Sequence, residues 1–480
     1  MHQLSGLDAS FLYLETTNAP MHVSGLAIYD PSTAPGGKVR FKQIIDTVER
    51  RAHLVPAMTS RLQFVPWGLD HPYWVNDGSF DPEFHVRHVA LPAPGDWRQL
   101  CILISRIHAR PLDRSRPLWE SYIIEGLDNV EGFPKGCFAA FTKIHHAAVD
   151  GASGVDISAI VHDLEPVPSK PEPSAPVHAV DKTPRELRLL MNAQRNTLKI
   201  PGRLFNVVKR TAPGIVKAAK GVASGELKII SDVPRTRFNT TVSPHRVFNG
   251  ICVPFETIRL IKNHYEKVTV NDVALAIVGG ALRHYLAEHN ELPEESLTAM
   301  APINVRTQDK LGKAGNEVSK MTVKLRTDIA DAADRLVAVN ESTRDAKELT
   351  NAIGAKTMTD YTQFVPSTIT ASAAKLASYL SLANKFKLGF NCVVTNVPGP
   401  PIPLYYSGAK MLGNYFTGPV QDGVGLFHAI SSYAGDFTIA FTACREMMPD
   451  PDFYAQCMKR SFDELLACVS EEQGGKPADA

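Results

Sequence analysis

The stretch KIHHAAVDGASG, residues 143–154, carries the pattern from which both the fold and the site are predicted. It continues the mostly apolar run CFAAFTKIH (137–145), which predicts a strand, and the small residues after Gly151 favour the start of a helix. If His145 and His146 end that strand, their side chains point to opposite faces, so only one of them can face a given cavity. Gly151 permits a tight turn into the helix.

Spacing alone leaves three interpretations of the two histidines. They can be ordinary histidines with structural hydrogen-bond partners, which is the common case for any single histidine. His146 and Asp150 can instead belong to a metal site, but a His-x3-Asp pair lacks the third and fourth ligands that zinc requires. A neutral imidazole at the end of a strand can also act as a general base near pH 7. On spacing alone, the structural interpretation is favoured.

The rest of the chain alternates helical and strand-like patterns without an obvious repeat. In the first 165 residues, strands are expected at 119–127 and 137–145 and helical spacing at 41–48 and 100–107. The second half is also mixed, with expected strands at 247–255, 297–305, 320–325 and 390–397, a hairpin at 431–441, and helices at 256–266, 271–288, 331–349 and 369–387. This alternation predicts an α/β (α+β) protein built from two halves.

Composition and charge exclude several classes of protein. Lys and Arg total 51 and Asp and Glu total 50, and a net charge of +1 does not suit a globally basic nucleic-acid binder. The 44% hydrophobic content allows a large core, and no stretch approaches the ~18–20 apolar residues of a membrane span. The N-terminus lacks the pattern of a secretory signal. Seven cysteines without a CxxC pair disfavour a disulfide framework or a zinc ribbon and suit a reducing cytosol.

Two segments of unusual composition separate the halves. Residues 165–177 contain five prolines, which predicts an extended, solvated connection. Residues 182–237 carry 13 Lys and Arg against three acids, with apolar residues at helical intervals. Such a basic amphipathic segment is either a connecting helix packed on a domain or an attachment to an anionic membrane. Composition alone favours the connecting helix.

The letters of the histidine motif resemble a known signature. HHxxxDG, here His145 to Gly151, is the active-site signature of the CoA-dependent acyltransferase superfamily. More specifically, the chain resembles the bacterial wax ester synthase/diacylglycerol acyltransferase family over nearly its whole length. The family's other motifs follow in order as LSGLDASFLYLET (4–16), Pro117-Leu118-Trp119, Asn271-Asp272, PINVR (302–306), Gly315-Asn316, TNVPGP (395–400) and SYAGDFTIAF (432–441). A minor departure is Thr395, where serine is more usual in the family.

The resemblance implies a fold of two chloramphenicol-acetyltransferase-like domains with an active-site tunnel at their interface. Along the chain, this gives an N-terminal half (1–165), a Pro-rich and then basic linker (166–240), a C-terminal half (241–470) and a disordered tail (471–480).

The resemblance also implies an activity. The expected reaction joins a fatty acyl group from acyl-CoA to a long-chain alcohol or a diacylglycerol, giving a wax ester or a triacylglycerol plus CoA, without an acyl-enzyme, a cofactor or a metal. A mainly triacylglycerol-forming enzyme is the alternative. A catalytically silent lipid-droplet scaffold is disfavoured by the intact motif, and a condensation domain would normally adjoin carrier domains, for which 480 residues leave no room.

Residue roles carry over from the family motif by motif. His146 is the expected general base, and His145 is expected to support its loop. Asp150 is expected to form a structural ion pair, with Arg306 as the candidate partner, and Gly151 completes the motif. These roles are implied by the resemblance.

Three further residues are candidates for substrate contacts. Asn271 is expected either to donate to the oxyanion or orient the base, or to cap the helix that follows it, and the two are about equally supported. Trp119 and Pro117 are candidates to line the tunnel, although a buried strand aromatic is the commoner explanation for Trp119.

The implied substrates partition into membranes or oil droplets. A chain without an apolar span must meet them at an interface, so the resemblance shifts the balance for residues 182–237 toward surface attachment. The expected location is the cytoplasm, at the inner face of the membrane or on lipid inclusions, with no nucleic-acid partner.

Overall fold

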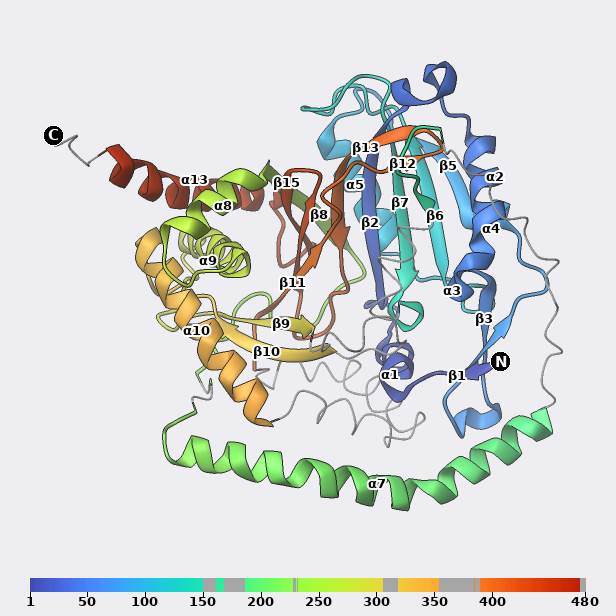
Figure 1. Cartoon of the computed structure of the whole chain (residues 1–480), viewed down its shortest axis with the longest axis horizontal. Helices are drawn as coiled ribbons and strands as arrows, with labels where there is room; N and C mark the ends of the chain where they lie inside the picture. The colour runs from blue at the N-terminus through green and yellow to red at the C-terminus, as the bar shows by residue number, and fades with distance from the viewer. Residues whose placement is uncertain are drawn as a thin grey trace.

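The computed structural model describes residues 1–149, 161–167, 186–227, 230, 232–304, 318–353, 384 and 389–474. These residues form two six-stranded sheets that stand side by side, each with helices against it, and a small three-stranded sheet (Figure 1). The small sheet joins β1, β4 and β3, which span His2–Gln3, Tyr73–Asn76 and Ser60–Gln63. The predicted mixed α/β class is confirmed.

The first sheet has the order β12-β13-β2-β7-β6-β5, with β5 and β6 parallel and the other neighbours antiparallel. Along β7, Phe138 and Ala140 join the core beneath α2, whereas Ala139 and Phe141 join the core beneath α5, because successive side chains alternate between faces. The strands span Tyr405–Tyr406, Ala409–Thr417, His22–Asp30, Phe138–His145, Trp119–Glu125 and Val86–Ala90, in sheet order, and the helices α2 and α5 span Phe41–Arg51 and Trp97–His108.

The second sheet has the order β10-β9-β11-β14-β15-β8 and packs on helices α8, α9, α10 and α13. The central helix α9 is almost wholly buried in this core. The expected hairpin is confirmed, since Ala434 and Gly435 form its turn with positive φ angles of 47° and 101°. The strands span Val318–Lys324, Thr298–Asn304, Cys392–Pro398, Leu426–Tyr433, Asp436–Cys444 and Arg246–Pro254, and the helices span Phe255–His264, Val270–Glu288, Ala332–Ile353 and Pro451–Gly474.

The two sheets exchange chain segments. Strands β12 and β13 belong to the C-terminal half of the sequence, yet β13 pairs with β2 of the first sheet, with Gly413 opposite Ile28. This pairing satisfies the backbone groups that β2 would otherwise expose at a sheet edge. The division into residues 1–165 and 241–470 therefore follows the order of the chain and differs from the division between the sheets.

The basic linker forms a long helix. Helix α7, Glu186–Ala223, runs along the lower edge of the molecule in Figure 1, apart from both sheets. Leu189 and Ala193, on one face of α7, are buried against Val65 and Tyr73 of the N-terminal half. Pro201 and Pro213 lie inside the helix, and Figure 1 shows it bowed.

The remaining boundaries differ little from the sequence patterns. Helix α13 continues to Gly474, so residues 471–474 are helical, and residues 475–480 lie outside the described part, as do most of the Pro-rich connection and nearly all of the expected helix at 369–387. Short helices α3 and α4 span Pro56–Thr59 and Pro82–His85. Within the described ranges, no helix combines the length and the apolar character needed to cross a membrane.

Candidate active site

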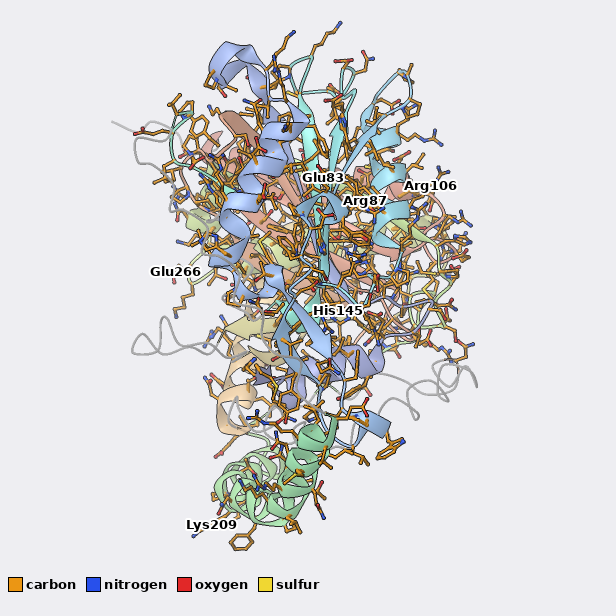
Figure 2. The ribbon with its side chains drawn as sticks, turned by 90° about the vertical axis from the view of Figure 1, so that its right-hand side faces the viewer. Glu83, Arg87, Arg106, His145, Lys209 and Glu266 are labelled. Carbon is orange, nitrogen blue, oxygen red and sulfur yellow. The ribbon has the colours of Figure 1, made fainter. Side chains whose placement is uncertain are left out.

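The two histidines sit where β7 turns into a short 3₁₀ turn, His146–Ala148. The end of the strand is held from both sides, because the His145 amide donates to the Leu118 carbonyl at 2.9 Å and the His146 amide donates to the Met21 carbonyl at 2.8 Å. Figure 2 shows His145 toward the lower end of the first sheet, on the side of the molecule on which α7 lies.

His145 is buried, and both of its ring nitrogens take part in hydrogen bonds. Its Nδ1 accepts from the Ala147 amide at 3.0 Å, so this nitrogen carries no proton. Its Nε2 therefore carries the proton and donates it to Glu15 Oε2 at 2.8 Å. An imidazole held in this way caps the turn that carries His146.

Glu15 is a site residue that sequence reasoning did not single out. It lies at the C-cap of α1 (Gly6–Leu14) with its side chain 7% exposed, and besides the His145 ring it accepts from Met21 N at 3.0 Å and pairs with Arg114 Nη2 at 2.9 Å. Burial acts to raise the pKa of Glu15, but the hydrogen bond from His145, with Arg114 and the Met21 amide, lowers it to about 2. One signal was available: a carboxylate at a helix C-terminus opposes the helix dipole and so needs another partner.

His146 has different surroundings. Its ring is partly buried and stacks on Phe11 of α1, with the ring centroids 3.8 Å apart and the planes at 16°. Helix α1 therefore contacts both histidines, one through Phe11 and the other through Glu15 at its C-cap. This short N-terminal helix holds the orientation of the motif.

A row of buried polar groups continues from His145 along the same face of the first sheet. Lys143 is fully buried, and its Nζ lies 2.8 Å from the Arg110 carbonyl and 3.4 Å from Glu120 Oε2. Burial lowers the pKa of Lys143, an effect that Glu120 opposes. His22, opposite His145 in the register, is neutral because burial lowers its pKa well below the usual range. Buried polar contacts thus hold this end of β7.

The structure corrects one alternative for Asn271. The N-cap of α9 is Thr269, whose side chain accepts from the Asp272 amide while the Asp272 carboxylate accepts from the Thr269 amide. Asn271 is therefore not the cap; it is partly buried at the second position of the first turn. Asp272 is fully buried and also accepts from Asn340 Nδ2 at 2.9 Å. The role of Asn271 toward an oxyanion stays a prediction.

Trp119 and Pro117 lie in the interior of the N-terminal half. Trp119 is 3% exposed, donates through Nε1 to the Met58 carbonyl at 2.9 Å and stacks on His85 at 4.6 Å. These contacts are those of a core aromatic. Pro117 is buried beside it, and its carbonyl accepts from the Trp119 amide at 2.9 Å. Contact of either residue with substrate stays a prediction.

Three of the predicted site residues, Asp150, Gly151 and Arg306, lie outside the described residues. The described residues therefore bring together His145 and His146 with Glu15 and Phe11, and they place Trp119 in the adjoining core. Within the described ranges, no three His, Cys, Asp or Glu side chains are grouped so as to hold a metal ion.

Comparison with known proteins gives matches over nearly the whole chain. Residues 4–274 match the wax ester synthase/diacylglycerol acyltransferase catalytic domain, and residues 314–466 match the C-terminal domain of the same family. A Mycobacterium tuberculosis (strain H37Rv) protein with the provisional name diacylglycerol O-acyltransferase is 31% identical over 477 residues, 99% of this chain and 92% of that protein. A similarly named Mycobacterium bovis protein is 30% identical over 468 residues, covering 96% and 98%.

Solved structures agree with these matches. The wax ester synthase/diacylglycerol acyltransferase from Marinobacter aquaeolei VT8 has a TM-score of 0.69 at 27% identity, covering 98% of this chain and 100% of that one. A starter condensation domain of rhizomide synthetase, at 11% identity and a TM-score of 0.53, covers 98% and 95% and shows a likeness of fold alone. The chain therefore belongs to the wax ester synthase/diacylglycerol acyltransferase family of O-acyltransferases.

Proposed function

We propose that the protein transfers a fatty acyl group from acyl-CoA to the hydroxyl of a long-chain alcohol, and also to diacylglycerol, with His146 as general base. One observation carries the assignment of the base. His145 already uses both ring nitrogens, so it cannot take a proton from substrate without losing the hydrogen bond that caps the turn. His146, on the same turn, is the second histidine of the motif, the one to which the family resemblance assigns the role of base.

The proposed reaction is a direct displacement. As the alcohol oxygen attacks the thioester carbonyl, its proton passes to the His146 imidazole. The tetrahedral intermediate then collapses, the carbon–sulfur bond breaks, and the imidazolium returns the proton to the CoA thiolate. No acyl-enzyme forms and no cofactor is required, because the thioester is itself the activated group. General-base assistance accounts for about 10²–10⁴-fold, so orientation of the two substrates and stabilisation of the oxyanion supply the rest.

Diacylglycerol as the main acceptor is the second candidate, and the names of the mycobacterial relatives favour it. One assay tests both candidates. Purified protein receives palmitoyl-CoA with hexadecanol or with dioleoylglycerol in separate reactions, and the esters are quantified. Faster ester formation with hexadecanol supports the wax ester activity, and faster formation with dioleoylglycerol supports the alternative. No ester with either acceptor contradicts the proposed function and favours the silent scaffold.

For Asp150, we propose an ion pair with Arg306 that maintains the fold. Asp150→Ala is expected to lower soluble yield and melting temperature as well as turnover, because an unpaired charge is left behind. Arg306→Ala should lower yield, melting temperature and turnover in the same way. The double variant should be no less stable than either single variant, since the destabilising effects of mutations at paired residues are not additive. An inactive Asp150→Ala protein with wild-type yield and melting temperature would contradict the structural role.

The substrates also imply a place in the cell. We propose that the protein works in the cytoplasm, at the inner face of the membrane or on lipid inclusions, and reaches the lipid through residues 182–237. The excess of basic residues in this segment supports attraction to anionic lipid.

A further inference from the structure

Helix α7 exposes a line of large apolar side chains on its solvent side. Five such residues follow one another at spacings of four, seven, seven and eleven positions. Since each residue turns the helix by 100°, all five side chains lie within an arc of about 40° around the helix axis. The five residues, with their exposed fractions, are Leu187 (69%), Met191 (48%), Leu198 (77%), Phe205 (68%) and Val216 (52%).

This line is separate from the face with which α7 packs on the protein. Leu189 and Ala193, two buried residues of the packing face, lie roughly opposite this line on the helix circumference. The helix thus has one apolar face that the protein covers and a second that it leaves to solvent. Aligned exposed apolar side chains mark interaction surfaces more often than scattered ones do.

A loop beside the first part of α7 extends this apolar surface. Phe64, Trp67 and Leu69 are 45%, 78% and 56% exposed, while Val65 of the same loop packs on Leu189 of α7. Trp67 has a φ of 57°, a left-handed conformation that is costly for a bulky side chain and that concentrates at functional sites. We call the five α7 residues together with the loop 64–69 the outer apolar surface.

The charge around the outer apolar surface selects its partner. Helix α7 contains eight Lys and Arg and one acid, Glu186. Arg188, Arg195 and Lys199 are exposed, and Figure 2 shows Lys209 at the lowest edge of the molecule, directed away from the body. A second copy docked through the same helix would bring two strongly positive helices together. A surface of anionic lipid headgroups offers the complementary charge as well as an apolar layer.

We infer that the outer apolar surface lies in the plane of an anionic membrane, with the α7 line and the Trp67 loop inserted at the level of the headgroups. The inference deepens the proposed function and rests on it for lipid-borne substrates. A helix of 38 residues extends for roughly 57 Å, so it anchors the molecule along its whole lower edge. Tryptophan is favoured at this depth because its ring is apolar and its N–H is polar. The histidine motif lies toward the same side, which shortens the path of substrates from the lipid.

The test compares full-length variants in flotation with vesicles of phosphatidylcholine containing phosphatidylglycerol. Leu198→Gln/Phe205→Gln removes apolar area and keeps the charge of α7, and Trp67→Asn suits the left-handed backbone better than tryptophan does. Each change is expected to weaken partitioning about tenfold or more. The matched control is Ile102→Gln/Leu260→Gln, which removes exposed apolar side chains from α5 and α8 and should bind like the wild type. Vesicles of phosphatidylcholine alone should bind the wild type more weakly.

Acyl transfer to dissolved octanol separates this inference from the proposed function. The α7 double variant should keep wild-type transfer to octanol while losing vesicle binding, since it leaves the histidine motif intact. The protein could instead show no transfer activity and still bind vesicles in a way that depends on Leu198 and Phe205. That result would refute the proposed function and support membrane binding by the outer apolar surface. Wild-type vesicle binding by the double variant, or a wild-type dimer that the variant converts to a monomer, would overturn the inference.

Discussion

Replacing His146 with alanine is expected to lower kcat for acyl transfer by about 10²–10⁴-fold, the usual contribution of a general base. The alcohol must then lose its proton to water, which is neither held nor oriented at the reacting oxygen. The measurement is CoA release from palmitoyl-CoA with hexadecanol, at saturating concentrations of both substrates. Because no acyl-enzyme is proposed, the variant should show neither a burst of CoA nor acylated protein.

The stack between His146 and Phe11 provides the control for this prediction. Phe11→Leu removes the ring contact and keeps the imidazole, so it should retain far more activity than His146→Ala while losing a comparable packing contact. His145→Ala should lower the melting temperature, because it uncaps the turn at Ala147. A folded His146→Ala protein that forms ester at the wild-type rate would refute His146 as the base.

Replacing Glu15 with glutamine is expected to lower both stability and turnover. A glutamine can still accept from His145 and Met21 through its oxygen, but its amide then faces the Arg114 guanidinium, donor against donor. Leaving the partly buried charge of Arg114 without its carboxylate partner costs about 1–3 kcal/mol or more of unfolding free energy. Displacement of the His145 ring would also move the turn that carries His146. Thermal unfolding and the kcat of the same samples measure the two effects.

The pH dependence of stability distinguishes Glu15 from other acids. The folded-state pKa of Glu15, about 2, lies below the usual glutamate value of 4.5, so the stabilisation is complete above pH 4.5 and is lost as the pH falls toward 2. It amounts to up to about 3 kcal/mol, and the Glu15→Gln variant should lack this component of the acid loss. The matched control is Glu125→Gln, whose carboxylate contacts His88 at 3.1 Å in an exposed pair and should matter little. Equal acid sensitivity of the wild type and Glu15→Gln would contradict the buried pairing.

Patterns local in sequence predicted much of the fold. The alternation along residues 137–145 marked β7, and the hairpin at 431–441 was recognisable from its turn residues. The basic segment had helical periodicity, and α7 follows it. These predictions succeeded because side chains repeat every two residues on one face of a strand and every 3.6 residues on one face of a helix. The spacing of apolar residues in the sequence shows these periods directly.

Predictions failed where neighbouring residues compete for the same role. Asn271 has the chemistry of an N-cap, but Thr269 takes that position because Asp272 completes a reciprocal pair with it. Pairing between distant segments is a separate matter: β13 pairs with β2, some 380 residues earlier in the sequence. Sequence patterns carry no information about which distant edge a strand will complete.

By itself, the sequence determined the two α/β halves, the basic helix between them and, through the motif HHAAVDG, the pair of histidines at the end of a strand. Only the tertiary structure decided what holds each histidine, because Glu15 contacts His145 and Phe11 contacts His146 from a helix about 130 residues away. Only the tertiary structure also decided which face of α7 is covered. A helical repeat reveals that apolar faces exist, and packing against the rest of the molecule determines which of them remains exposed.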